Sequence, residues 1–312
     1  DLLFLPLMTY KHLLKLYSSN KISYTFFINN KHKLEKYYYT PKSYEEIKQA
    51  VDNYCDFPNQ YLPMYGSITF WNTSYITDMN NLFYSKEDFN EDISDWNTIN
   101  VTNMSYMFYC ARNFNQPLNW NTENVTDMQG MFYYAKSLNQ PLNNWDVSNI
   151  INMVGMFCNA NSFNQPLNWN TENVTDMSYM FYNANSFNQP LNNWNVSNVK
   201  IMSSMFSNAN SFNQPLNWNT ENVTDMSYMF YNANSFNQPL NNWNVSNVKI
   251  MSSMFAGAKN FNQPLNTWNV SNVEHMSSMF CNAENFNQLL NWNINENCDK
   301  NNMFYGSNGK LI

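Results

Sequence analysis

Hydrophobic and polar residues follow one pattern that recurs every 24 or 25 residues along most of the chain. In the copy that begins at Phe163, the stretch Leu167-Asn168-Trp169-Asn170 alternates apolar and polar side chains. That alternation is the period of a strand with one buried face. Pro166 stands just before the stretch, where a missing N–H is tolerated. The pattern therefore predicts a short β-strand over residues 167–170.

Further along the same copy the period lengthens. Apolar residues fall at positions i, i+3, i+6, i+7 and i+10, namely Val174, Met177, Met180, Phe181 and Ala184. This spacing predicts a short α-helix or a 3-10 turn, which the side-chain oxygen of Thr175 or Asp176 could cap.

The ten tryptophans mark the copies, because successive ones are 24 or 25 residues apart: Trp71, Trp96, Trp120, Trp145, Trp169, Trp194, Trp218, Trp243, Trp268 and Trp292. A fixed period of this length is typical of a repeat array. One short strand and one short helix cannot bury a tryptophan and a phenylalanine alone, so neighbouring coils must stack. We therefore predict a repeat solenoid of ten coils over residues 67–306, with a parallel sheet along one side and the tryptophans in its core.

The two ends of the array differ from its middle. At the front, Ser43-Tyr44-Glu45-Glu46 forms a capping box, and helical spacing follows it. Residues 41–66 are thus expected to be a helical N-terminal cap, preceded by a helical extension over residues 1–40. In the last coil Asn297 replaces the repeat valine and Lys300 replaces the first methionine, as in a half-exposed terminal coil. Residues 307–312 are expected to be a C-terminal tail.

The abundant asparagines have a structural interpretation. Asn164, Gln165 and Asn168 recur at matching places in the interior coils, and stacked amides can form hydrogen-bonded ladders. Asn173 precedes the repeat valine, and we expect it to bond local backbone at a turn. Residues 159–206 and 208–255 are identical, which indicates a recent duplication of two coils.

Composition and charge exclude several classes of function. The formal net charge is −7 and no block of Lys or Arg interrupts the array, so binding to nucleic acid is not expected. The five cysteines contain no CxxC pair, and His12, His32 and His275 are far apart. Phosphate-binding glycine motifs are absent from the sequence. We therefore expect no metal site, no cofactor and no enzymatic activity.

No stretch of about 20 apolar residues occurs, so no membrane span is expected. The apolar stretch over residues 1–8 is short and begins with an acidic residue, which makes it a poor signal peptide. The location stays open, and a cytoplasmic or virion-associated one is favoured over secretion.

The motif V-T-D-M-S-Y-M-F at residues 174–181, followed by F-N-Q-P-L at 187–191 and by Trp194, resembles the coils of the BspA-like leucine-rich-repeat surface proteins. The resemblance covers about residues 41–306. It implies a leucine-rich-repeat-like solenoid used for adhesion or protein binding, and it offers no catalytic residues to carry over. Such repeats occur in bacterial surface lipoproteins and in large DNA viruses with AT-rich genomes. The lipobox cysteine of the lipoproteins is missing in this sequence.

Two sets of residues that recur along the array are candidates for recognition. The acidic set, which recurs every second coil and could attract a cation or a basic partner, comprises Glu123, Glu172, Glu221, Asp127, Asp176 and Asp225. The tyrosine set, which offers contact area at little cost in side-chain entropy, comprises Tyr106, Tyr179, Tyr228, Tyr109, Tyr133, Tyr182 and Tyr231. Alternatively, the acidic residues form a solvated face and cap helices, and the tyrosines pack between coils.

These patterns favour a non-enzymatic repeat scaffold that binds a protein or a surface glycan. One alternative is a substrate-recruiting adaptor, because Leu5-Pro6 followed by leucines 13, 14 and 16 loosely resembles an F-box-like start. Another is a structural component of a virion or cell surface.

Overall fold

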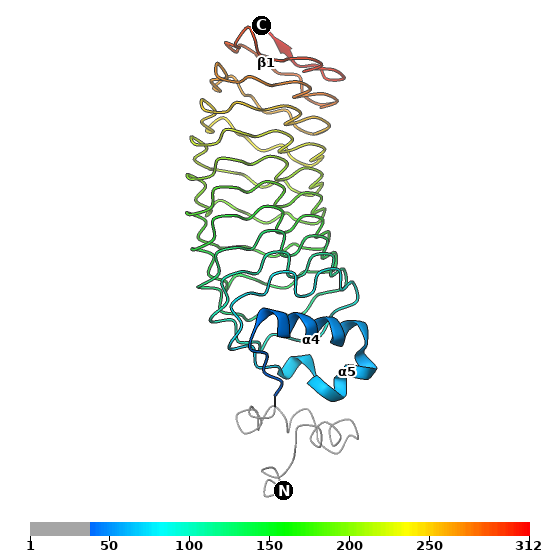
Figure 1. Cartoon of the computed structure of the whole chain (residues 1–312). Helices are drawn as coiled ribbons and strands as arrows, with labels where there is room; N and C mark the ends of the chain where they lie inside the picture. The colour runs from blue at the N-terminus through cyan, green and yellow to red at the C-terminus, as the bar shows by residue number, and fades with distance from the viewer. Residues whose placement is uncertain (1–37) are drawn as a thin grey trace, which may run out of the picture.

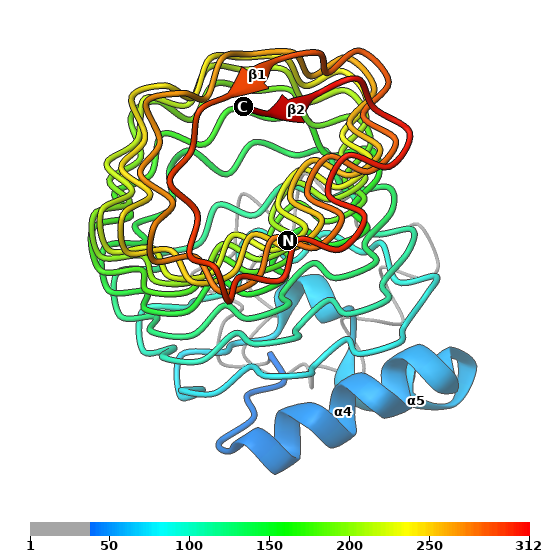
Figure 2. The same cartoon turned by 90° about the horizontal axis from the view of Figure 1, so that it is seen from above.

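The computed structural model of the chain describes residues 38–312, in which successive copies of the repeat lie on one another along a single axis (Figure 1). Two helices, α4 (Tyr44–Asp56) and α5 (Pro58–Tyr65), stand at the N-terminal end of the stack. The 3-10 helix η3 (Ile68–Phe70) leads into the first coil, and two short strands, β1 (Leu289–Leu290) and β2 (Lys310–Leu311), lie at the other end. Seen along the axis, the coils overlie one another as rings (Figure 2).

Neighbouring coils are joined in parallel through one bridge residue in each coil. The ten bridge residues, each paired with the next, are Asp78, Asn103, Asp127, Asn152, Asp176, Ile201, Asp225, Ile250, His275 and Asp299. Their spacing of 24 or 25 residues is the period of the tryptophans. The chain is therefore a repeat protein in which each coil bonds the equivalent part of its neighbour.

The strand and the α-helix that the sequence predicts within each coil are both wrong, whereas the alternative of a 3-10 turn has the i+3 to i hydrogen bonds that this segment shows. Residues 167–170 belong to no strand, and the parallel bridge lies instead at Asp176. Residues 177–184 form consecutive β-turns, closed by N–H groups that donate to the carbonyl three residues earlier, as from Met180 to Met177 (3.3 Å). Tyr179 and Asn183 have φ values of 58° and 56°, and a left-handed residue at this place is the mark of a type II turn.

The turns replace a helix because they leave half of the N–H groups free to join the coils. Between the donors that close turns, the N–H of Tyr179 donates to the carbonyl of Ser203 (3.0 Å) and that of Phe181 to the carbonyl of Met205 (2.9 Å), both in the next coil. A helix would direct every interior N–H into its own coil. Buried backbone groups need hydrogen-bond partners. In the alternating turns, every second N–H bonds within its own coil and the others bond the next coil.

Aromatic side chains fill the inside of the stack in columns. Phe181 lies 4.0 Å from Phe187 in the same coil and 5.6 Å from Phe206 in the next, measured between ring centroids. The rings of Trp169 and Trp194 are 6.3 Å apart and nearly parallel. All ten tryptophans are buried, the most exposed being Trp292 at 8%. The core therefore runs without interruption from coil to coil.

Amide side chains form a ladder on the outside, as the sequence predicts. The N–H of Asn188 donates to Oδ1 of Asn164 (3.0 Å), and Nε2 of Gln189 donates to the same oxygen (3.1 Å). The prediction that Asn173 bonds local backbone is wrong, because its Nδ2 donates to the carbonyl of Ser148 in the preceding coil (2.7 Å). Asparagine side chains thus form hydrogen bonds between neighbouring coils at several places in each coil.

At the front of the stack, α4 closes the core. Its N-cap Ser43 accepts a hydrogen bond from the N–H of Glu46 (3.3 Å), and the Glu46 carboxylate accepts one from the N–H of Lys42 (2.7 Å). The helix buries three side chains against the aromatic core: Ile47, Ala50 and Val51. Helices α4 and α5 both lie within residues 41–66, the range for which the sequence predicts a helical cap. The expected extension lies outside the described residues except for residues 38–40, and so does the F-box-like stretch.

At the back, the last coil departs from the repeat. Asn297 is exposed and the adjacent Cys298 is buried in its stead. The chain then continues as β2, in which Lys310 pairs with Leu289 of β1, so that the expected tail lies along the last coil. Within residues 38–312, neither helix has the length and apolar content that crossing a membrane requires.

Candidate binding surfaces

The side of the stack built from residues 177–184 and their equivalents, here named the turn face, has two recurring positions in every coil. Some of the residues there are exposed, such as Tyr179, and others are buried, such as Ser204 and Asn159. Both positions have left-handed backbone. The first comprises Asn81, Tyr106, Gly130, Gly155, Tyr179, Ser204, Tyr228, Ser253, Ser278 and Asn302. The second comprises Ser85, Cys110, Tyr134, Asn159, Asn183, Asn208, Asn232, Gly257, Asn282 and Gly306. The core phenylalanine between them is present in all ten coils, so the turn face varies while its support stays constant.

Four of the predicted tyrosines form two pairs on this face. The rings of Tyr179 and Tyr182 are 5.9 Å apart, and those of Tyr228 and Tyr231 are 5.8 Å apart. Tyr179 and Tyr228 are 46% and 45% exposed, whereas their partners are half-buried. The two pairs lie two coils apart, separated by a coil that carries Ser204 at the first position.

Tyr106 behaves differently from these pairs because it lies across the next coil. A Cβ atom added at Gly130 would be 2.5 Å from Cε1 of Tyr106, so the ring occupies the space that a larger residue would need. Burial, and then the negative charge of Asp127, raise the pKa of the Tyr106 hydroxyl. Of the seven predicted tyrosines, Tyr106 therefore packs between coils and four form the two pairs, whereas Tyr109 and Tyr133 belong to a separate stack.

The first three coils carry a tyrosine stack that the sequence analysis identified only in part. The rings of Tyr84 and Tyr109 are 4.6 Å apart, and those of Tyr109 and Tyr133 are 5.0 Å apart. Tyr134 lies beside Tyr133 at 5.1 Å. Burial, and then a hydrogen bond with the Cys158 thiol, raise the pKa of Tyr133. Tyr84 and Tyr134 were missed, although Tyr84 stands directly after a core phenylalanine, as Tyr109 does.

The predicted aspartates take part in the turns as well as facing solvent. Oδ1 of Asp176 accepts the N–H of Ser178 (2.8 Å), and Asp127 and Asp225 make the equivalent bond two residues on. All three are half-buried bridge residues. They therefore cap turns, in place of the helix that the sequence predicts.

The predicted glutamates Glu123, Glu172 and Glu221 are exposed, and none of the six predicted acidic residues forms an ion pair within residues 38–312. Along the bridge row, Asn152 stands between Asp127 and Asp176, and Ile201 stands between Asp176 and Asp225. The bridge row thus places a neutral side chain between successive carboxylates.

A family model described as "Mycoplasma protein of unknown function, DUF285" matches the chain three times, over residues 57–168, 141–217 and 215–310. The matches together include all ten tryptophans and cover more than half of the sequence. The chain belongs to this family. No curated protein matches the chain, and no solved structure does.

The matches to DUF285 include the turn face of every coil, so the variable positions belong to the repeats of this family. Helix α4 lies before the first matched residue, whereas α5 lies within the first match. The junction between cap and repeats therefore lies where the match to the family model begins.

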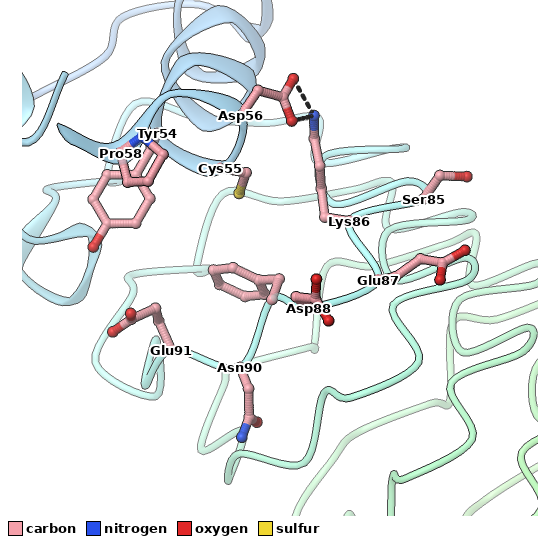
Figure 3. A pocket seen from close by; sticks show the side chains of 11 residues that line it. Tyr54, Cys55, Asp56, Pro58, Ser85, Lys86, Glu87, Asp88, Asn90 and Glu91 are labelled. Atoms are coloured by element: carbon pink, nitrogen blue, oxygen red, sulfur yellow. Dashed lines mark hydrogen bonds and ion pairs between the residues drawn. The ribbon is translucent and has the colours of Figure 1, made fainter. Parts of the chain in front are cut away.

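A cleft of about 500 Å³ lies at this junction (Figure 3). One wall comes from the end of α4 and the start of α5, and the other from the segment that links the first two coils. The lining residues are Tyr54, Cys55, Asp56, Pro58, Ser85, Lys86, Glu87, Asp88, Phe89, Asn90 and Glu91. Sequence reasoning missed this cleft, because one of its walls lies in the cap, outside the repeated pattern.

Lys86 holds the two walls of the cleft together. Its Nζ lies 2.7 Å from Oδ1 of Asp56 and 3.1 Å from Oδ1 of Asp52 (Figure 3 shows the first partner). Burial disfavours the charged amine, but the two aspartates outweigh it and raise the pKa of Lys86. Beside them, burial raises the pKa of the Cys55 thiol to about 12, which keeps it protonated and a weak nucleophile at neutral pH.

Proposed function

We propose that the protein is a non-enzymatic binding scaffold, built as a leucine-rich-repeat-like solenoid, that holds a protein partner on its turn face. One observation carries the proposal: the core phenylalanine is the same in all ten coils, while the left-handed position two residues before it is occupied by Asn, Tyr, Gly or Ser. Stacked repeats that share a core and vary on one face offer an extended surface that can be composed residue by residue.

The exposed tyrosine pairs support a protein partner over other classes. Tyr179 with Tyr182, and Tyr228 with Tyr231, present large amphipathic rings on backbone that is bonded to the next coil. Rings held in this way lose little entropy on binding, which is why tyrosine is frequent at protein contact surfaces. The resemblance to BspA-like surface proteins points in the same direction, since adhesion and protein binding are what it implies.

A partner can be found and then tested with one matched pair of variants. The intact chain is used for affinity capture, and each candidate is purified and titrated against the wild type. The first variant replaces Tyr179, Tyr182, Tyr228 and Tyr231 by serine, and the control replaces Glu172 and Glu221 by glutamine. We expect the tyrosine variant to weaken binding by about a hundredfold or more, and the control to bind as the wild type does.

Three outcomes would contradict all or part of the proposal. A partner that binds both variants with unchanged affinity does not use the turn face. A partner lost only with the glutamine variant uses the acidic set instead. If a glycan array, and no protein, retains the wild-type chain, the partner class is wrong while the scaffold remains.

A further inference from the structure

Helix α5 has exposed apolar side chains although it belongs to the folded cap. None of its residues is buried, and Pro63 interrupts its interior. Phe57 and Met64 are seven residues apart and so lie close to one face of the helix, where they are 58% and 63% exposed; these two side chains are here named the α5 patch, and Leu62, 42% exposed, lies on another face. Helices of eight residues are not stable in water without packing. The patch therefore lacks a covering element within residues 38–312.

The chain enters the described structure beside this helix. Tyr39 lies 4.6 Å from Tyr65, the last residue of α5, measured between ring centroids, and its carbonyl accepts the N–H of Asn72 (2.9 Å). An eight-residue helix is about 12 Å long, and extended chain covers about 3.3 Å per residue. The residues directly before Tyr38 are therefore within reach of the whole patch and of the cleft at its far end.

The cleft next to the first residue of α5 is acidic. Four carboxylates line it, those of Asp56, Glu87, Asp88 and Glu91, against the single amine of Lys86. Lys86 is already neutralised by its own aspartates, and Glu91 forms no ion pair among residues 38–312. The cleft and the α5 patch together form an apolar surface with a negative end.

Residues 1–37 have the complementary composition. They hold six of the 16 basic residues and two of the 23 acidic ones, so they carry a net charge of +4, and the remainder of the chain carries −11. Three of these lysines, Lys31, Lys33 and Lys36, lie within eight residues of the entry point, and aromatic and aliphatic residues stand among and before them. A tethered segment also acts at an effective concentration of about millimolar, which favours it over a free partner.

We propose that residues 1–37 of the same chain dock on the α5 patch and direct lysines into the acidic cleft, so that the front end of the stack is covered by the chain itself. The docked segment buries Phe57 and Met64 and pairs with Glu91. The interaction lies at the cap, away from the tyrosine pairs of the turn face, and does not depend on the proposed partner.

The test uses the full-length chain with a photo-crosslinking amino acid at Met64, and a control with the same probe at Ile151, which is 55% exposed on the fourth coil. Mixing isotopically light and heavy protein distinguishes a crosslink within one chain from one between two copies. We expect the Met64 probe to link to peptides from residues 1–37 of the same chain, and the Ile151 probe not to do so. Crosslinks to a second copy, or none from Met64 to this segment, would overturn the proposal.

Charge variants test the direction of docking. Replacing Lys31, Lys33 and Lys36 by glutamate should lower the Met64 crosslink about fivefold, and adding Asp88→Lys and Glu91→Lys should restore it. Raising the salt from about 0.05 to 0.5 M should weaken the crosslink of the unmutated segment in the same way. A crosslink indifferent to both changes would show that the lysines do not enter the cleft, and melting temperatures check that each variant is folded.

Discussion

The indole N–H of Trp194 donates to the carbonyl of Leu167, one coil earlier, over 2.9 Å. The equivalent bond recurs at each tryptophan of the interior, as from Trp169 to Leu142 (3.0 Å). Tryptophan is therefore used here for two properties together, a broad ring that stacks on one neighbouring tryptophan, as Trp194 does on Trp169, and a donor that reaches back to the preceding coil. No other large aromatic residue offers a ring N–H at this place.

Replacing Trp194 by alanine should lower the free energy of unfolding by about 3–5 kcal/mol, because it empties a buried position in the middle of the core. Trp194→Phe retains a ring but leaves the Leu167 carbonyl without its donor, and should lower it by about 1–3 kcal/mol. Denaturant unfolding of the three proteins measures both values. Equal stability of the wild type and the alanine variant would mean that the buried tryptophans do not hold the coils together.

The amide ladder predicts a different response at Asn164. Its Oδ1 accepts bonds from the Asn188 N–H and from Gln189, so Asn164→Ala should lower stability by about 1–2 kcal/mol. Asn164→Asp keeps an acceptor oxygen in place and should be tolerated better at neutral pH. Thermal melting of the two variants compares them, and an aspartate variant less stable than the alanine one would argue against the ladder.

A side chain added at Gly130 should clash with the Tyr106 ring, in addition to any backbone strain. The φ of Gly130 is +57°, a conformation that tyrosine and serine adopt at the same position in other coils, but an added Cβ would be 2.5 Å from Cε1 of Tyr106. Gly130→Ala should therefore lower stability by about 1–3 kcal/mol. Tyr106→Ser in the same chain should recover most of that loss. A double-mutant cycle measures the coupling, and additive effects would show that the ring does not lie over the glycine.

Alkaline pH should loosen the cap. Burial raises the pKa of both Tyr39 and Tyr54 to about 12, whereas an exposed tyrosine titrates near 10. Since the folded state holds these protons more tightly, their stabilisation is complete below about pH 10 and is lost as pH rises through about 12. Melting temperatures between about pH 9 and 12 measure this loss, which should be smaller for Tyr54→Phe.

The sequence predicted the repeat, its period and which residues are buried, but not the local backbone. The spacing of Val174, Met177, Phe181 and Ala184 fits a helix, and it fits a run of β-turns equally well, because both bring together residues three apart. The overlooked signal was the asparagine or glycine that recurs two residues after the core phenylalanine, as at Asn183, where backbone of positive φ is required.

For the candidate surface, the sequence could name the tyrosines but not their neighbours. That Tyr106 leans onto Gly130 depends on the register between two coils, which the bridge from Asn103 to Asp127 sets. The cleft beside α5 depends on the angle at which the cap meets the first coil, and no repeated pattern records that angle. The sequence therefore predicted which types of residue lie between coils, but it did not predict the contacts between the cap and the first coil.

The alternating turns also give the stack a dipole along its axis. Within residues 177–184 the N–H groups that join coils, such as those of Tyr179 and Phe181, all point toward the C-terminal end. Aligned peptide dipoles add up, as they do in a helix, and leave partial positive charge where the donors emerge. A further coil packed against Phe304 would have to offer carbonyl oxygens to these N–H groups. Along this face, coils can therefore be added in only one orientation.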